Sequence, residues 1–289
     1  MHLGSIAGVS WVWWLGFHLV AALLLAGDAW LTRGRPNSLR AGLSTAGLIM
    51  AAGLMAVTIG LSQGRQPALE FVAGYTVELS LSIDNLFVFL VLFQGFRIGV
   101  ERQHKALLYG VCGALVLRGI FIGSGIALLN HFAWISYVFG LILLVAGWRL
   151  VRGGDAAAAI PAWVRRLQKR SGSLLAVIVA VELTDLLFAV DSIPAVLAVS
   201  HNPFVVYTSN IAAILGLRSL YFALSALLDR LRYLHYGLGV LLGFVALKML
   251  AARWLEIPIL WSLGIMGLIL GVCVLFSLLF RTGNRPSTG

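Results

Sequence analysis

The stretches DLLFAVDS, residues 185–192, and ELSLSIDN, residues 78–85, each place two carboxylates six residues apart inside a long apolar run. In both stretches a small polar residue follows the second acid. An acid at membrane depth is energetically costly, and it usually marks the path of an ion or a proton. Two acid pairs with the same spacing therefore predict a duplicated half-site for a cation.

The apolar character extends over the whole chain. Of the 289 residues, 60% are hydrophobic and 11% are charged, whereas a soluble domain carries about 25% charged residues. Apolar runs of about 20 residues match the thickness of a bilayer. Only helices and closed barrels satisfy the backbone in lipid. Because the runs are continuous rather than alternating, they predict an all-α polytopic membrane protein with a single transmembrane domain over residues 1–289.

Nine apolar runs predict nine transmembrane helices. Alternate loops differ sharply in charge, with 15 Lys and Arg residues on one side and only Arg65 and Arg253 on the other. The positive-inside rule then places the N-terminus outside and the C-terminus inside. The net charge of +10 follows from this topology, so nucleic acid is not expected as a partner. The runs cover roughly 8–30, 42–62, 70–95, 106–129, 134–151, 172–199, 204–228, 234–251 and 260–280.

Two segments resemble each other, residues 71–152 and residues 178–253. When their acid pairs are aligned, Arg118 falls near Arg218, and each segment holds three predicted spans. An odd number of spans inserts the two copies in opposite orientations, and such inverted repeats place a transporter's binding site near the midplane. The rest of the chain is expected to form peripheral helices at 8–62 and 260–280 and a cytoplasmic linker at 153–171.

The acidic stretches offer only oxygen ligands. Carboxylate, amide and hydroxyl groups favour Mg²⁺, Ca²⁺ or Mn²⁺ over zinc or copper. On straight helices the two acids of a pair point about 120° apart, so we expect a distortion at Pro194, which has no N–H to donate. The predicted metal ligands are Glu78, Asp84, Asn85, Glu182, Asp185, Asp191, Ser192 and Asn210.

The basic residues of the spans offer a purely structural alternative. Arg118 and Arg218 lie mid-span and are assigned an electrostatic or gating role, since each can neutralise an acid. Two arginines against five acids leave three carboxylates that must be protonated, bind a cation or face water. Arg149 and Lys248, near span ends, are expected to extend to the membrane surface. Asp28, near the inner end of the first span, is expected to be solvated.

The second acidic stretch and its surroundings resemble a known signature. Residues 181–195, VELTDLLFAVDSIPA, and residues 203–221, PFVVYTSNIAAILGLRSLY, are similar to the TerC/Alx family, and residues 78–85 resemble its first acidic motif. The likeness extends over nearly the whole chain. It implies a LysE-like fold and manganese efflux from the bacterial cytoplasm through the acids of both motifs.

The resulting hypothesis is a multi-pass Mn²⁺ exporter of the bacterial inner membrane, driven by proton exchange. Divalent cations, protons and the lipid bilayer are its expected partners, and neither enzymatic activity nor a cofactor is expected. Three alternatives remain open: a transporter or channel for Ca²⁺, Mg²⁺ or H⁺, an intramembrane enzyme using paired aspartates, and a scaffold with membrane-protein partners that assists metalation of exported proteins. Tellurite, for which the family is named, is an anion and suits five acids poorly.

Overall fold

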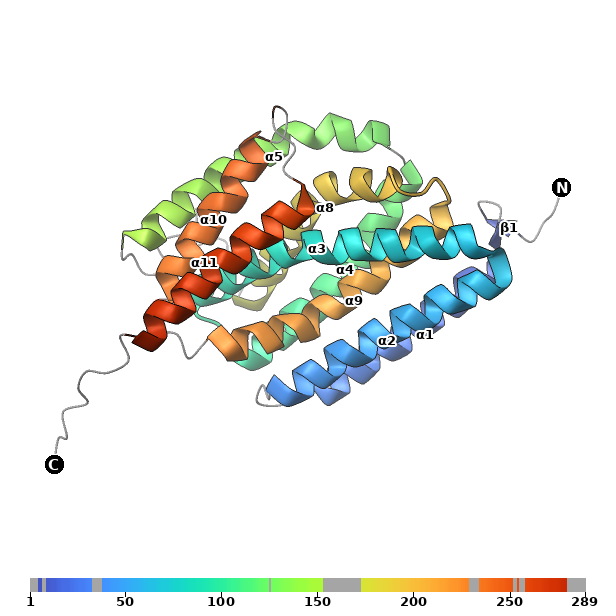
Figure 1. Cartoon of the computed structure of the whole chain (residues 1–289), viewed down its shortest axis with the longest axis horizontal. Helices are drawn as coiled ribbons and strands as arrows, with labels where there is room; N and C mark the ends of the chain where they lie inside the picture. Colours follow the sequence, from blue (N-terminus) through green and yellow to red (C-terminus); the bar gives the residue numbers. More distant parts are fainter. Residues whose placement is uncertain are drawn as a thin grey trace.

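The chain folds into helices that follow its apolar runs. A computed structural model describes residues 5–6, 9–32, 38–124, 126–152, 173–228, 234–251, 254 and 258–279. Within these ranges there are nine helices and one short antiparallel strand pair (Figure 1). Five of these helices are long and apolar enough to cross a membrane. The prediction of an all-helical polytopic membrane protein is therefore confirmed.

The helix boundaries lie close to those expected from hydropathy. The largest difference concerns residues 130–133, which were expected to form a loop but lie inside a helix. Asn and His disfavour a helix only slightly, and the segment contains no Gly or Pro, which disfavour it strongly. The elements are β1 Ser5–Ile6, β2 Val9–Ser10, α1 Trp11–Leu31, α2 Ser38–Gln63, α3 Arg65–Phe96, α4 Val100–Ser124, α5 Ile126–Val151, α8 Ser173–Leu197, α9 Pro203–Leu228, α10 Leu234–Ala251 and α11 Ile259–Leu279.

Both acidic helices are continuous. α3 runs through the whole first acidic stretch, and α8 continues past Pro194 to Leu197. The helix is therefore not interrupted at Pro194, and the expected local distortion there stays a prediction. A proline removes one helical hydrogen bond, and membrane helices tolerate this loss because neighbouring groups satisfy the freed carbonyl. Pro194 also lies only three residues before the helix ends, so little of α8 depends on the missing bond.

The helices of the two similar segments pack in a reciprocal pattern. α3 packs against α9 as α8 packs against α4, and α10 contacts α3 as α5 contacts α8. The pairs α3 with α8, α4 with α9 and α5 with α10 are also in contact. If α3 is exchanged with α8, α4 with α9 and α5 with α10, the contacts named here stay the same. Figure 1 shows α10 and α11 beside one end of α3, and α2 beside the other.

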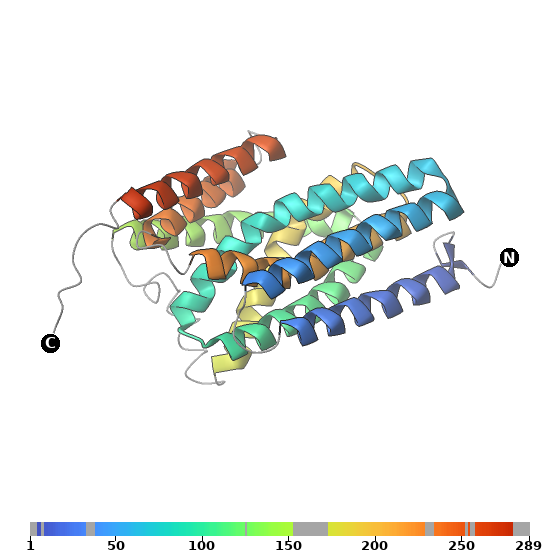
Figure 2. The same ribbon diagram turned by 60° about the horizontal axis from the view of Figure 1, so that its bottom comes forward.

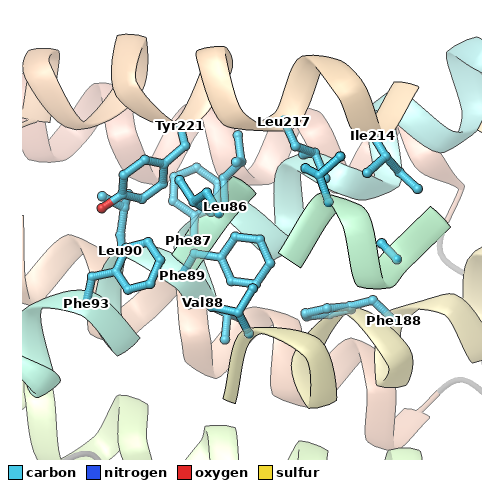
Figure 3. Packing of buried hydrophobic residues seen from close by; sticks show 14 of the residues in the cluster. Leu86, Phe87, Val88, Phe89, Leu90, Phe93, Phe188, Ile214, Leu217 and Tyr221 are labelled. Carbon is cyan, nitrogen blue, oxygen red and sulfur yellow. The ribbon is translucent and has the colours of Figure 1, made fainter. Parts of the chain in front are cut away.

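The C-terminal half of α3 forms the centre of the apolar core. Figure 3 shows Phe89 between side chains of α9 and Phe188 of α8, and Phe93 beside Tyr221. Phe93 meets Tyr221 of α9 edge to face, with ring centroids 5.3 Å apart. Lipid tails are as apolar as these side chains, so the hydrophobic effect does not drive helices together within a bilayer. Close van der Waals packing of this kind holds them together instead. The part of α3 that forms this apolar core begins directly after Asn85, so its packing positions the first acidic stretch.

Candidate functional site

Arg118 is fully buried and forms the centre of a polar cluster inside the protein. Its Nη1 donates to Glu78 Oε1 at 2.5 Å and to Ser192 Oγ at 3.2 Å. The same nitrogen donates to Asn210 Oδ1, and Nη2 donates to Asp185 Oδ1 at 3.4 Å. One guanidinium therefore joins α3, α4, α8 and α9. Four of the predicted ligands meet at this point, around a cation supplied by the protein.

Glu78 has hydrogen-bond partners on both carboxylate oxygens. Asn210 Nδ2 donates to Glu78 Oε2 at 3.1 Å, and Ser82 Oγ donates to Oε1 at 3.3 Å, in addition to the bond from Arg118. The side chain is 1% exposed. These bonds replace the hydrogen bonds that water would make to an exposed carboxylate.

Asp84 is bonded to a different cation. Lys248 Nζ, from α10, donates to Asp84 Oδ2 at 2.8 Å and to Ser262 Oγ of α11 at 3.1 Å. The expectation that Lys248 extends to the membrane surface is therefore wrong. Its ammonium turns inward because a buried carboxylate supplies a charge partner there. This ion pair ties α10 and α11 to the first acidic helix.

Three buried side-chain oxygens in the described part of the chain have no hydrogen-bond partner. They are Asp84 Oδ1, Asn85 Oδ1 and Glu182 Oε2. All three belong to residues that were predicted as metal ligands. Most buried polar atoms in proteins are hydrogen-bonded, so each exception calls for an explanation. Unpartnered acceptor oxygens are the atoms at which a cation or a proton would be stabilised.

Glu182 lies against a glycine of the neighbouring helix. A Cβ at Gly113 of α4 would come within 2.0 Å of Glu182 Oε1 and 2.5 Å of Oε2. The carboxylate therefore occupies space that only a glycine leaves open. Sequence reasoning missed Gly113, because nothing in a single sequence separates it from the other glycines of the chain.

The predicted ligands do not form one pocket in this conformation. Among the side chains that the structure describes, no three of His, Cys, Asp and Glu are close enough to hold a common metal ion. Asp84 and Glu182 have no bond to Arg118. The predicted ligand Asp191 belongs to α8, and its side chain lies outside the described residues.

Arg218 belongs to a second buried cluster. Its Nη1 donates to Asp28 Oδ2 at 2.9 Å, and its Nη2 donates to Thr32 Oγ1 at 2.9 Å and lies 3.2 Å from His104 Nδ1. Ser44 Oγ donates to Asp28 Oδ1 at 2.5 Å. The expectation that Asp28 is solvated is therefore wrong, because the arginine of α9 provides a buried partner for its charge. These bonds join α1, α2, α4 and α9.

A small cavity separates the two clusters. It has a volume of about 20 Å³, and its wall includes both Asp185 and Arg218. The remaining wall is mostly apolar, with Val111 and Ala114 of α4 among its members. A cavity needs roughly 10–15 Å³ to hold one water molecule. The acid of one cluster and the cation of the other thus line the same water-sized cavity.

Comparison with known proteins assigns the family. Residues 63–285 match the family described as "Integral membrane protein TerC family". The chain belongs to the TerC family. A TerC relative from Photorhabdus laumondii, named putative membrane-bound redox modulator Alx, is 40% identical over 243 residues, which cover 76% of each chain. The protein of the same name from Escherichia coli K12 is 38% identical over 291 residues, covering 87% of this chain and 89% of the relative.

The TerC relatives extend beyond bacteria. The chloroplastic thylakoid membrane protein TERC of Arabidopsis thaliana is 38% identical over 252 residues, covering 79% of this chain and 66% of that protein. No solved structure matches this chain. The match to the TerC family confirms the resemblance seen in the acidic motifs, and the chain is a multi-pass membrane protein. The Arg118 cluster lies entirely inside the matched residues, whereas Asp28 precedes them.

Proposed function

We propose that this TerC protein exports a divalent cation, most favourably Mn²⁺, from the bacterial cytoplasm in exchange for protons. The proposal rests on one observation. Among the described residues, the acids of the two motifs outnumber the basic side chains that are bonded to them. Four carboxylates against two cations leave an excess of two negative charges, which one divalent cation or two protons would neutralise. The acids are Glu78, Asp84, Glu182 and Asp185, and the cations are Arg118 and Lys248.

The unpartnered oxygens support the same proposal. Asp84 Oδ1, Asn85 Oδ1 and Glu182 Oε2 are buried acceptors that nothing in the described chain satisfies. Carboxylate and amide oxygens are ligands of Mn²⁺, Mg²⁺ and Ca²⁺. Arg118 and Lys248 would then be resident cations that an incoming metal ion displaces. Displacement requires movement of α4 and α10, which carry these two residues, and so couples binding to a change of conformation.

An inverted repeat provides such a change. We propose that α3–α5 and α8–α10 are oppositely oriented copies in a LysE-like arrangement of nine spans, with the N-terminus outside and the C-terminus inside. The matched contacts of α3 with α9 and α8 with α4, and of α3 with α10 and α8 with α5, support this. The Arg118 cluster lies between α3 and α8, the corresponding first helices of the two copies. In transporters built from inverted repeats, rocking of one copy against the other exposes a central site to alternate sides.

The second cluster supports a route from the cytoplasm. Asp28 lies near the end of α1 and His104 near the start of α4, both at the membrane face that the positive-inside rule assigns to the cytoplasm. From there the water-sized cavity leads from Arg218 to Asp185. A cation on this route would meet the charge of Arg218, which Asp28 offsets. The ion pair would therefore control entry to the acidic site.

Transport by purified protein in proteoliposomes tests the proposal. Vesicles that contain a metal-sensitive dye and, in parallel, a pH-sensitive dye are exposed to Mn²⁺, Mg²⁺ or Ca²⁺. We expect Mn²⁺ entry together with proton movement in the opposite direction, at a rate at least tenfold above protein-free vesicles. Faster transport of Mg²⁺ or Ca²⁺ would reassign the substrate. Proton movement without any metal would favour a proton channel, and no movement of any ion would favour the scaffold.

The name of the bacterial relatives points to redox modulation as a second candidate. This chain contains two cysteines, Cys112 at the surface of α4 and Cys273 buried in α11, and both are free thiols. A variant with both cysteines replaced by serine separates the candidates. Unchanged Mn²⁺ transport by this variant would assign transport to the carboxylates, and lost transport would connect it to thiol chemistry.

A further inference from the structure

Helix α1 is attached to the rest of the protein at two separated places. Toward its start, His18 Nε2 lies 3.0 Å from the hydroxyl of Tyr207 on α9. Toward its end, Asp28 is paired with Arg218 of the same helix at 2.9 Å. Figure 2 shows α1 standing apart from α2 along most of its length. The two attachments hold α1 in place without requiring close packing between them.

α1, α2 and α9 surround a groove of about 550 Å³, which runs past the first of these attachments and ends before the second. Small residues widen it, with Gly16 and Ala21 on α1 and Ala51 and Ala52 on α2. Of the described residues that line the groove, Thr58 alone carries a hydroxyl. The wall is otherwise apolar, so the groove suits a hydrocarbon ligand.

We propose that this groove binds one acyl chain of a membrane phospholipid. On α1 the lining runs from Val12 to Leu24, a rise of about 18 Å along a helix. One leaflet of a bilayer contributes about 15 Å of hydrocarbon. The groove therefore extends over the depth of a single leaflet, which is the depth that one acyl chain spans.

The volume agrees with this occupant. An apolar cavity of about 150 Å³ holds benzene, which corresponds to roughly 25 Å³ per carbon. An acyl chain of about 16 to 18 carbons then needs roughly 400–450 Å³, which fits within the groove. A transmembrane helix about 10 Å wide and 30 Å long occupies on the order of 2,400 Å³. A helix from a second copy of this chain would therefore place only part of its volume in the groove, whereas one acyl chain fits within it.

Water is also an unsuitable occupant. A buried water molecule needs two to four polar partners, and the wall does not supply them to a column of waters. The bilayer, in contrast, is in direct contact with the rim, where Val20 is 50% exposed and Leu54 is 67% exposed. An acyl chain entering from this side gains dispersion contacts that an unfilled wall would forfeit.

One end of the groove lies near the start of α1. Trp13, near the start of α1, and Thr58, toward the end of α2, line the groove at this end. Tryptophan favours the membrane interface because its ring is apolar and its N–H is polar. We therefore place the lipid headgroup at this face, which is the outer face in the proposed orientation.

Native mass spectrometry of the full chain tests the proposal. Gly16 lines the groove, and a Cβ added there meets no atom within 4 Å, so the side chain of Gly16→Phe has open space at its base and is expected to occupy the groove. Gly27 lies on the same helix with equally open space but does not line the groove, which makes Gly27→Phe the matched control. Each protein is delipidated in detergent and then offered palmitoyl-oleoyl phosphatidylglycerol.

We expect the unmodified chain and Gly27→Phe to retain one lipid per chain and Gly16→Phe to retain at least fivefold less. Equal retention by all three proteins would overturn the proposal. So would a dimer that Gly16→Phe dissociates without loss of lipid, because a second copy would then occupy the groove. Ala51→Phe, from the α2 wall, provides a second groove variant if Gly16→Phe folds poorly, and the same fivefold loss is expected of it.

Discussion

Arg118 and Glu78 form a salt bridge of 2.5 Å between two side chains that are each only 1% exposed. They are forty residues apart in the sequence, and they connect α4 to the first acidic helix. Replacing one partner of a buried ion pair leaves the other charge without compensation, whereas the pair itself need not be strongly stabilising. The pair therefore serves the conformation in which it forms, and removal of one partner should be costly.

Removal of the guanidinium should destabilise the protein. We expect Arg118→Gln to lower the free energy of unfolding by about 3–5 kcal/mol, because Glu78 and Asp185 lose their counterion. The double variant Arg118→Gln with Glu78→Gln should lose less than the sum of the two single variants, by about 0.5–3 kcal/mol. Denaturant unfolding in detergent micelles measures all three. Strictly additive losses would show that the two side chains are not coupled.

Loss of one site carboxylate should abolish transport. Asp84→Asn preserves the shape of the side chain but removes the charge that Lys248 and a metal ion share. We expect Mn²⁺ entry into proteoliposomes to fall at least tenfold, and the same of Asp191→Asn. Glu101→Gln, at an exposed acid in the first turn of α4, is the control and should transport normally. Normal rates in both aspartate variants would rule out the carboxylate site.

Gly113 should matter for function more than for stability. In Gly113→Ala the new Cβ would overlap the carboxylate of Glu182. That carboxylate is the end of a flexible side chain, so it can move aside, and alanine also favours the helix by roughly 0.5–1 kcal/mol. We expect an unfolding midpoint close to that of the unmodified protein but Mn²⁺ transport reduced at least threefold.

A matched glycine and a compensating change check this interpretation. Gly123, on the same helix, has open space where a Cβ would be, and Gly123→Ala should leave transport unchanged. Adding Glu182→Asp to Gly113→Ala shortens the displaced acid and should restore part of the lost rate. Full activity of Gly113→Ala alone would show that the position of Glu182 is unimportant.

The attachment of α1 should depend on charge more than on the single hydroxyl bond. Asp28→Asn leaves Arg218 buried without its counterion, so we expect a loss of about 3–5 kcal/mol in the free energy of unfolding. Ser44→Ala removes one hydrogen bond to the same carboxylate and should cost about 1.5–3 kcal/mol, the range for a bond to a charged group. Denaturant titrations in micelles compare the two. If Asp28→Asn lowered the free energy of unfolding by no more than Ser44→Ala, the result would contradict a buried ion pair.

The helices were predictable because bilayer thickness sets the length of an apolar run. Each of the nine predicted runs corresponds to a helix in the described residues, and the first acidic stretch lies in the middle of α3 as expected. The partners of the charged residues were less predictable. Lys248 and Asp28 were both expected at the membrane surface, and both are instead partners in inward-facing ion pairs.

By itself the sequence determined that this is a helical membrane protein of the TerC family, with carboxylates at membrane depth, because hydropathy and motif are local properties of the chain. Only the tertiary structure decided which cation faces which acid. That choice depends on how each helix is rotated and which helix lies beside it. Arg118 and Arg218 occupy similar places in the two segments, yet one bonds to Glu78 and Asp185 and the other to Asp28, because α1 lies beside α9.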